Sequence, residues 1–274
     1  MSRLFPDRFL IALRPEALAL LRVSGWRRPR VSEMRTIACD PAAGSEPWEG
    51  AAAALARLAE EIAKVSARVT VVLSNHFARY VLVPWSEGLG KTEEETAFAR
   101  YCFAKIHGER SRNWDLRLSP GPSGATRIAS AVDAPLVQAL RAAFSAEAKL
   151  VSIQPYLMSA FNRWRSQMKG ARAWLLLVEP ERSCLARLDR GQLTAVRNSR
   201  GSFPGPEQWT GLLDRELHVM GGERATEDVY VHAPQGWEGS PETEGWTFRN
   251  LALAPPHGLA PAESGPFAMA LCAL

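Results

Sequence analysis

Cysteine is scarce in this sequence, and its four residues lie far apart, at Cys39, Cys102, Cys184 and Cys272. They form no Cys-x-x-Cys pair and no cysteine–histidine pair at zinc spacing, so the sequence indicates neither a metal knuckle nor a redox dithiol. Isolated thiols of this kind are typical of proteins in a reducing compartment. With 274 residues, 46% of them hydrophobic, the chain is long enough to form its own core without disulfides.

Long apolar runs are missing from the N-terminus. Charged residues at Arg8, Arg14 and Glu16 interrupt every run before it reaches the length of a signal peptide or a membrane span. We therefore expect a cytosolic protein that does not enter a bilayer by itself.

Motifs for catalysis are missing as well. The sequence has no Gly-x-Ser-x-Gly elbow, and its five histidines are isolated from one another. Gly88-Leu-Gly-Lys-Thr92 ends like a phosphate-binding loop, but such a loop needs a glycine where this chain has Trp85. We interpret it as a loop before a helix that opens with a Thr92/Glu95 capping box. His76 follows a predicted buried strand, as active-site residues often do, but Ser-Asn-His is also ordinary turn chemistry.

Positive charge is concentrated near the N-terminus, although the formal net charge is only +4. Within residues 1–35, three acids are outnumbered by the arginines Arg3, Arg8, Arg14, Arg22, Arg27, Arg28, Arg30 and Arg35. The turn at residues 26–30 could meet phosphates of nucleic acid or anionic lipid headgroups, while most such runs are simply solvated. Nucleic-acid binding through this turn stays an alternative function, although no RNP, KH or zinc pattern accompanies it.

Hydrophobic periodicity divides the chain into two similar halves. In the first half it predicts strands at 9–13, 17–23 and 31–38, a helix at 51–65 and a strand at 69–73. In the second half it predicts strands at 174–178, 183–188 and 193–197, a helix at 207–219 and a strand at 229–231. This duplication predicts two ribonuclease-H-like lobes, the α/β architecture shared by actin, sugar kinases and Hsp70-type ATPases.

A small α+β module separates the two halves. Its predicted elements are strands at 79–83, 115–118, 127–132 and 150–153 and helices at 92–107 and 133–144. A helix over 154–168 then leads into the second half. We therefore place the first lobe at residues 1–78, the inserted subdomain at 79–153, and the connecting helix with the second lobe at 154–274.

Four stretches carry a resemblance to a known family: residues 9–23, 73–85, 152–162 and 267–274. In them the chain resembles the actin-like pilus and secretion assembly proteins, which include PilM of type IV pili, the cytoplasmic region of GspL and the MshI-type proteins. The resemblance implies duplicated ribonuclease-H-like, actin-like ATPase lobes, with the insert as the extra subdomain of that branch.

Nucleotide-binding relatives use three loops, and this chain departs from their pattern at each one. After the first strand, Arg14 and Pro15 stand where a small glycine turn would let backbone N–H groups approach phosphate. The second loop has Glu179-Pro-Glu181 in place of Asp-x-Gly, and the adenine-side Gly-Gly is replaced by His232-Ala-Pro234. We therefore expect no ATP, no other cofactor, no metal and no catalytic residue.

The resemblance implies a non-catalytic cytoplasmic scaffold of a type IV pilus or type II secretion machine. Such proteins lie at the cytoplasmic face of the inner membrane, recruited by the cytosolic tail of a membrane-anchored partner, and they meet the membrane only indirectly. The partner groove would lie between the first lobe and the insert, bounded by residues 79–85, with Arg79, Tyr80 and Trp85 as contacts. An ATP-binding actin-like ATPase or switch is the alternative, and a homo-oligomer stays open.

Overall fold

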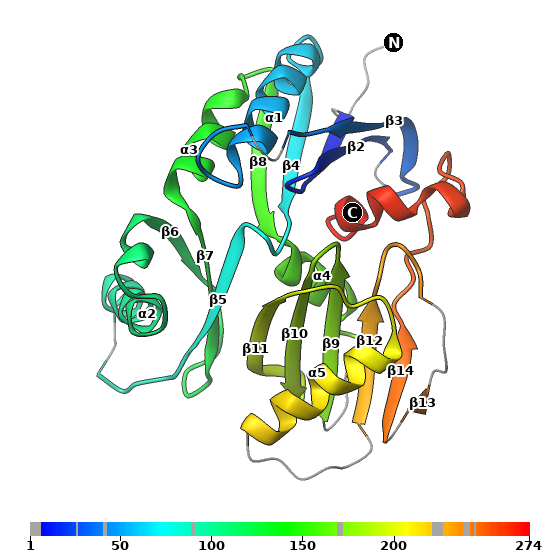
Figure 1. Ribbon diagram of the computed structural model, residues 1–274. Helices are drawn as coiled ribbons and strands as arrows, with labels where there is room; N and C mark the ends of the chain where they lie inside the picture. Colours follow the sequence, from blue (N-terminus) through cyan, green and yellow to red (C-terminus); the bar gives the residue numbers. More distant parts are fainter. Residues whose placement is uncertain are drawn as a thin grey trace.

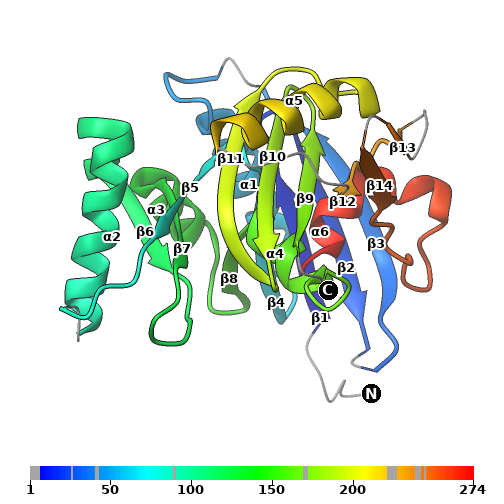
Figure 2. The ribbon, with the colours of Figure 1, turned by 90° about the horizontal axis from the view of Figure 1, so that it is seen from below.

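Two large sheets and a smaller third sheet make up the computed structural model, which describes residues 7–25, 27–40, 43–88, 91–168, 172–220, 227–237, 242–243 and 245–274. Figure 1 shows the first lobe at the top, the second lobe at the bottom and the insert at the left. Figure 2 shows the insert beside the two lobes from below.

The first sheet has the strand order β3-β2-β1-β4-β8. Its strands are β1 (Asp7–Leu13), β2 (Ala17–Ser24), β3 (Arg30–Ala38), β4 (Ala67–Leu73) and β8 (Ala148–Pro155). The hairpin strands β1, β2 and β3 are antiparallel, while β4 and β8 are parallel to β1. Helix α1 (Glu49–Ile62) carries the chain from β3 to β4. β1 lies in the middle of the sheet, and its apolar run is buried on both faces, as a central strand requires.

The second sheet repeats this arrangement in the order β11-β10-β9-β12-β14-β13. Its strands are β9 (Arg172–Glu179), β10 (Arg182–Asp189), β11 (Gln192–Arg200), β12 (Glu227–His232), β13 (Glu242–Thr243) and β14 (Trp246–Asn250). Helix α5 (Pro206–Val219) stands where α1 stands in the first lobe, between the third and fourth strands. The first five strands of both sheets therefore share one order, which confirms the two ribonuclease-H-like lobes.

Alternation along β9 gives the second sheet two buried faces. Trp174 and Leu176 pack with α5, whereas Leu175 and Leu177 belong to a core shared with the first lobe. This is the two-residue period of a strand with both faces covered. The shared core joins the lobes into one packed unit.

The insert has its own antiparallel sheet in the order β5-β7-β6. The strands are β5 (Ala78–Val83), β6 (Trp114–Leu118) and β7 (Arg127–Asp133), and helix α2 (Thr92–His107) covers one face around the buried Phe103. A 3-10 helix, η1 (Gly108–Asn113), joins α2 to β6. Helix α2 has Lys91 as its N-cap, and the Lys91 backbone N–H donates to Glu94 Oε2 over 3.2 Å, so the acid that caps this end is Glu94 rather than the predicted Glu95.

Two predicted elements of the insert lie elsewhere. The strand predicted at 150–153 is part of β8 and pairs with β4 in the first sheet, and α3 (Ala134–Ala143) packs on α1. A strand parallel to β4 needs a long crossover connection. The insert occupies that crossover, between β4 and α3. The pattern of one strand does not say which sheet it joins, so placing 150–153 in the insert was wrong.

Two helices each follow one lobe in the sequence and pack against the other lobe. Helix α4 (Tyr156–Trp164) follows β8 of the first lobe but meets β12 of the second, where Tyr156 Oη lies 2.5 Å from His232 Nδ1. Near the chain end, η2 (Pro261–Glu263), η3 (Gly265–Phe267) and α6 (Ala268–Leu271) return from the second lobe, and α6 packs on β1, β2 and β4. No described helix is both long and apolar enough to cross a bilayer.

Candidate functional site

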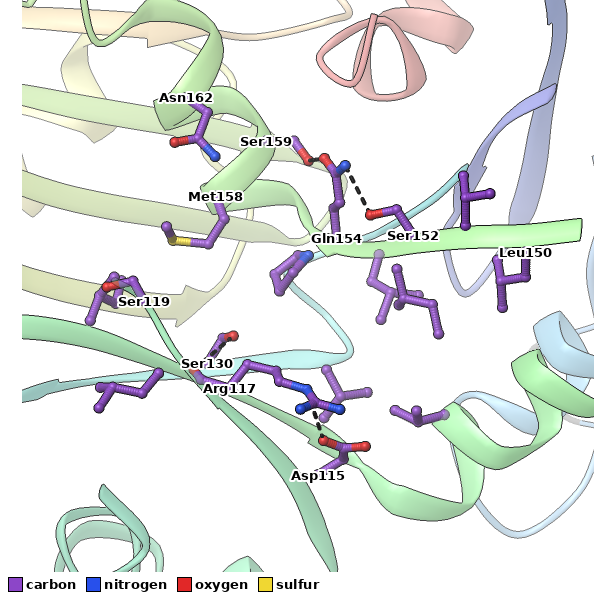
Figure 3. Close-up of a pocket in the computed structure, with 18 of the residues that line it drawn as sticks. Asp115, Arg117, Ser119, Ser130, Leu150, Ser152, Gln154, Met158, Ser159 and Asn162 are labelled. Atoms are coloured by element: carbon purple, nitrogen blue, oxygen red, sulfur yellow. Dashed lines mark hydrogen bonds and ion pairs between the residues drawn. The ribbon is translucent and has the colours of Figure 1, made fainter. Parts of the chain in front are cut away.

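A groove of about 580 Å³ lies between the first lobe and the insert (Figure 3). One wall comes from β8 and α4, and the other from β6 and β7. Along β7, Ile128, Ser130 and Val132 line the groove, while the alternate residues Ala129 and Ala131 pack toward α2. The insert sheet therefore uses one face for its own core and the other for the groove.

β8 presents its open edge to this groove. It is the last strand in the order of the first sheet, and all six residues from 150 to 155 line the groove. The strand has a bulge at Val151, between the partners of Val69 and Thr70. From Ser152 to Pro155 consecutive residues point to opposite faces, so this run of lining residues means that the strand edge faces the space. An edge strand carries backbone N–H and C=O groups that its own sheet leaves unpaired.

Fixed polar groups stand along the walls. Gln154 Nε2 donates to Ser152 Oγ over 3.1 Å, and Ser159 Oγ donates to Gln154 Oε1 over 2.8 Å. Across the groove, Asp115 lies 3.5 Å from the Arg141 Nη2 and 3.6 Å from the Arg117 Nε. Apolar surface between these groups comes from Val137, Leu150, Ile153 and Met158. The groove is thus mainly apolar, with a few oriented polar atoms, as binding sites usually are.

The three predicted contact residues lie on β5 and just after it, away from this groove. Tyr80 is 9% exposed, and its hydroxyl donates to Asn75 Oδ1 over 2.8 Å. Arg79 donates from Nη1 to the carbonyl oxygens of His76 and Ala78, at 2.9 and 3.0 Å. Trp85 is 45% exposed. A groove does lie between the first lobe and the insert, but β6, β7 and β8 bound it, and residues 79–85 do not line it. Partner contact by the three residues stays a prediction.

A second cavity, of about 700 Å³, separates the two lobes. Its walls include Arg14 after β1, the Glu179-Pro-Glu181 turn after β9 and Pro234 after β12. These are the three loops that the sequence places around a nucleotide in related folds. The structure therefore brings them together at one cleft.

Glu179 joins the lobes at the base of this cleft. Its carboxylate is 7% exposed and accepts hydrogen bonds from Ser74 Oγ and from the Asn75 N–H, the latter at 3.0 Å. Burial raises the pKa of Glu179, and the hydrogen bonds from Ser74 and Asn75 oppose that shift. A second tie comes from Asn198 of β11, whose Nδ2 donates to the Asn75 carbonyl over 2.7 Å. No local sequence pattern predicts these contacts, because their members come from separate lobes.

Glu181 and Arg14, which stand where glycine turns are expected, each have a defined backbone conformation or hydrogen bond. Glu181 has φ +53°, the left-handed conformation that glycine adopts most easily, so a glycine would fit this position of the turn. Arg14 Nε lies 3.6 Å from Glu16 Oε1, and the Arg14 backbone N–H closes the β1–β2 turn on the Ala17 carbonyl over 3.1 Å. Among the described residues, the buried Nε of Arg14 has no hydrogen-bond acceptor, since Glu16 lies beyond hydrogen-bond distance.

His76 lies beside the contacts of Glu179 without completing a catalytic triad. Its Nδ1 is 2.9 Å from Ser74 Oγ, and burial together with the cations of Arg182, Arg200 and Arg79 lowers the pKa of His76 to about 4. In a serine hydrolase the histidine stands between serine and acid. Here Ser74 stands between His76 and Glu179 and is fully buried, so the geometry is that of a structural hydrogen-bond network.

Several solved structures share this fold. A chain of the PilM–PilN type IV pilus biogenesis complex is 18% identical, with a TM-score of 0.65 over 97% of this chain and 96% of that one. The cytoplasmic domain of EpsL, an inner membrane component of the type II secretion system of Vibrio cholerae, is 14% identical, with a TM-score of 0.59 over 97% and 94%. A Bacteroides thetaiotaomicron protein with actin-like ATPase fold and unknown function is 12% identical, with a TM-score of 0.60 over 83% and 82%.

At these identities the likeness establishes the fold, and the chain has the actin-like ATPase fold. No protein-family model and no curated protein sequence matches it.

Proposed function

We propose that this chain is a non-catalytic cytoplasmic scaffold of a type IV pilus or type II secretion machine, of the PilM and GspL type. Its groove would bind the cytosolic tail of an inner-membrane partner. The observation that carries this proposal is the apolar groove of about 580 Å³ beside the open edge of β8.

The similar structures support the placement. One is a complex of two pilus biogenesis proteins, and another is the cytoplasmic domain of an inner membrane component of a secretion system. Both align with nearly the whole of this chain, including the insert that forms one wall of the groove.

The groove suits an extended peptide. A peptide that adds to a strand edge gains main-chain hydrogen bonds, and its alternate side chains enter pockets on the two sides. The six lining residues of β8 correspond to an extended segment of at most about 20 Å, at roughly 3.3 Å per residue, since the bulge at Val151 shortens the strand. Val137, Leu150 and Met158 offer apolar contact to such a segment. We expect a tail with two or three apolar residues at alternate positions.

The inter-lobe cleft argues against an ATP-driven switch. The carboxylate of Glu179 is already bound by Ser74 and Asn75, and Glu181 adds a second acid to the lining. The triphosphate of ATP would be repelled by these carboxylates, and the cleft lacks the glycine turns whose backbone N–H groups would bind it. In a titration with ATP and magnesium, we expect no change in thermal stability and no phosphate release. Tight binding or turnover would overturn the scaffold proposal.

Fluorescent peptides tested by anisotropy will identify the partner. The peptides are the cytosolic tails of neighbouring inner-membrane assembly proteins, and at least one is expected to bind. Asn162→Trp would fill the groove and Val151→Glu would place a negative charge in it, both at exposed positions. Each should weaken peptide binding at least tenfold. Asn250→Trp and Val219→Glu make the same changes at exposed positions of the second lobe and serve as matched controls. Failure of every tail, or equal loss in the controls, contradicts the proposal.

A further inference from the structure

Three cations lie side by side at the N-terminal ends of the parallel strands β1, β4 and β8 of the first sheet. Arg8 of β1 is in register with Arg68 of β4, and Arg68 is in register with Lys149 of β8. Residues in register on neighbouring parallel strands project to the same face, about 4.8 Å apart. Like charges placed directly opposite on neighbouring strands repel. Among the described residues, none of the three forms an ion pair with an acid.

The β2–β3 turn adds further cations to this row. Arg8 Nη2 donates to the Gly25 carbonyl over 3.4 Å, which holds the turn against the row. Arg27, Arg28 and Arg30 of the turn are all exposed. Lys64, also exposed, lies between α1 and the first residues of β4. We call this surface the cationic end and define it as Arg8, Arg27, Arg28, Arg30, Lys64, Arg68 and Lys149.

Few acids at the cationic end are available to neutralise it. Asp7 is held by Arg22, whose Nη2 and Nε lie 2.6 and 2.8 Å from Asp7 Oδ2, and Arg22 also approaches Glu33 at 4.0 Å. Glu147, next to β8, and Glu60, one helical turn before Lys64, are exposed, and the seven cations still outnumber them. A surface of this kind is stabilised by a partner that carries many negative charges.

We propose that the cationic end binds an anionic lipid bilayer directly. Its residues come from strand starts and one turn at the end of the lobe away from the second sheet (Figure 1). Neither the groove nor the cleft includes any of them, whereas proteins that track a single nucleic-acid strand use a cationic groove. Many cations spread over one end of a protein suit a plane of anionic headgroups.

The position of Lys149 links this surface to the groove. Lys149 belongs to the cationic end, and the next residue of β8, Leu150, already lines the groove. A bilayer bound at the cationic end would thus lie at the end of the groove where a tail leaving that bilayer can enter. This orientation rests on the proposed function, whereas binding to lipid does not.

Sedimentation with vesicles of phosphatidylglycerol and phosphatidylcholine tests the proposal on the full chain. We expect binding to the mixed vesicles at low salt, none to pure phosphatidylcholine, and a steep loss as salt shortens the screening length. Each neutralised cation should weaken binding roughly fivefold. Arg68→Gln/Lys149→Gln should therefore cost about 25-fold, and Arg27→Gln/Arg28→Gln/Arg30→Gln about 100-fold.

The matched control is Arg190→Gln/Arg215→Gln, which removes two cations that are 85% and 61% exposed in the second lobe. It should bind vesicles like the unchanged protein. Equal loss in this control, absence of binding to anionic vesicles, or equal binding to phosphatidylcholine overturns the proposal. The proposal is also overturned if the protein binds duplex DNA more tightly than anionic vesicles at the same salt concentration and the neutralised variants lose that DNA binding. Because no partner peptide is present, these outcomes are independent of the groove.

Discussion

The backbone N–H of Asn75, in the first lobe, donates a hydrogen bond of 3.0 Å to the Glu179 carboxylate in the second. With the neighbouring bond from Ser74 Oγ, it gives a buried carboxylate two donors across the lobe boundary. In an actin-like ATPase the space between the lobes belongs to a nucleotide. Here a side chain of the protein bridges them, and we infer that the lobes hold one relative position without a ligand.

Removing the acceptor at Glu179 should destabilise the fold more than removing its charge. Glu179→Ala leaves two buried donors unpaired, which costs about 2–4 kcal/mol, whereas the amide of Glu179→Gln still accepts a hydrogen bond and avoids a buried charge. We expect Glu179→Gln to stay within about 1 kcal/mol of the unchanged protein. Urea unfolding at pH 7 measures both variants. Equal losses would show that Glu179 does not act through these contacts.

The buried His232 should make the protein sensitive to acid. Burial lowers the pKa of His232 to about 3, against 6.5 for an exposed histidine. Below pH 6.5 His232 binds a proton in the unfolded chain but stays neutral in the folded protein. Its contribution to the free energy of unfolding is therefore fully present above pH 6.5 and is lost as the pH falls toward the folded-state pKa. At pH 5 the loss from this group is about 2 kcal/mol.

Urea unfolding of His232→Gln between pH 7 and 5 checks this. The variant lacks the titrating group and should lose less stability over that interval than the unchanged protein. His76 is unchanged in both proteins, and it continues to contribute through its own lowered pKa of about 4. Identical slopes in the two proteins would contradict the assignment to His232.

The turn at Glu181 should be more stable with glycine. Glu181 has φ +53°, a conformation that costs an ordinary residue about 1 kcal/mol and glycine little. We therefore expect Glu181→Gly to raise the free energy of unfolding by up to about 1 kcal/mol. Glu181→Ala keeps a Cβ atom and should not have this effect. We also expect Glu181→Gly to leave ATP unbound, since Pro15 and Glu179 remain.

Thiol reactivity should follow burial. Cys184 is fully buried and Cys272 is 5% exposed, and burial raises the pKa of both thiols. Cys102 on α2 is partly exposed. We expect a water-soluble thiol reagent to label Cys102 first in the native protein and the other thiols only after unfolding. Early labelling of Cys184 would contradict the packing of the inter-lobe core.

Much of the fold follows from local patterns. The apolar runs at residues 9–13 and 69–73 are buried strands, and the helical periodicity at 207–219 is the outer helix of the second lobe. These patterns are readable because burial of an element constrains residues two or four positions apart. The repeated order of elements indicates the duplication without any knowledge of strand pairing.

The candidate groove was only partly predictable. A family resemblance predicted a groove between the first lobe and the insert. It did not predict the walls: residues 79–85 lie on β5 and in the loop after it, whereas β6, β7 and β8 line the groove. The sequence left open whether Tyr80 contacts a partner or belongs to the core, and in the structure it is buried, with its hydroxyl bound to Asn75. An aromatic residue in a strand has the same local pattern whether a partner or the core covers it.

The sequence by itself determined the identity and order of the elements, the duplication and the loss of the glycine turns, since each is a property of neighbouring residues. Only the tertiary structure decided that β8 joins the first sheet, that Glu179 is bound by Ser74 and Asn75, and that Arg8, Arg68 and Lys149 form one row. These relationships join residues from 60 to more than 100 positions apart in the printed sequence. Strand pairing and packing set such contacts, and spacing along the chain does not encode them.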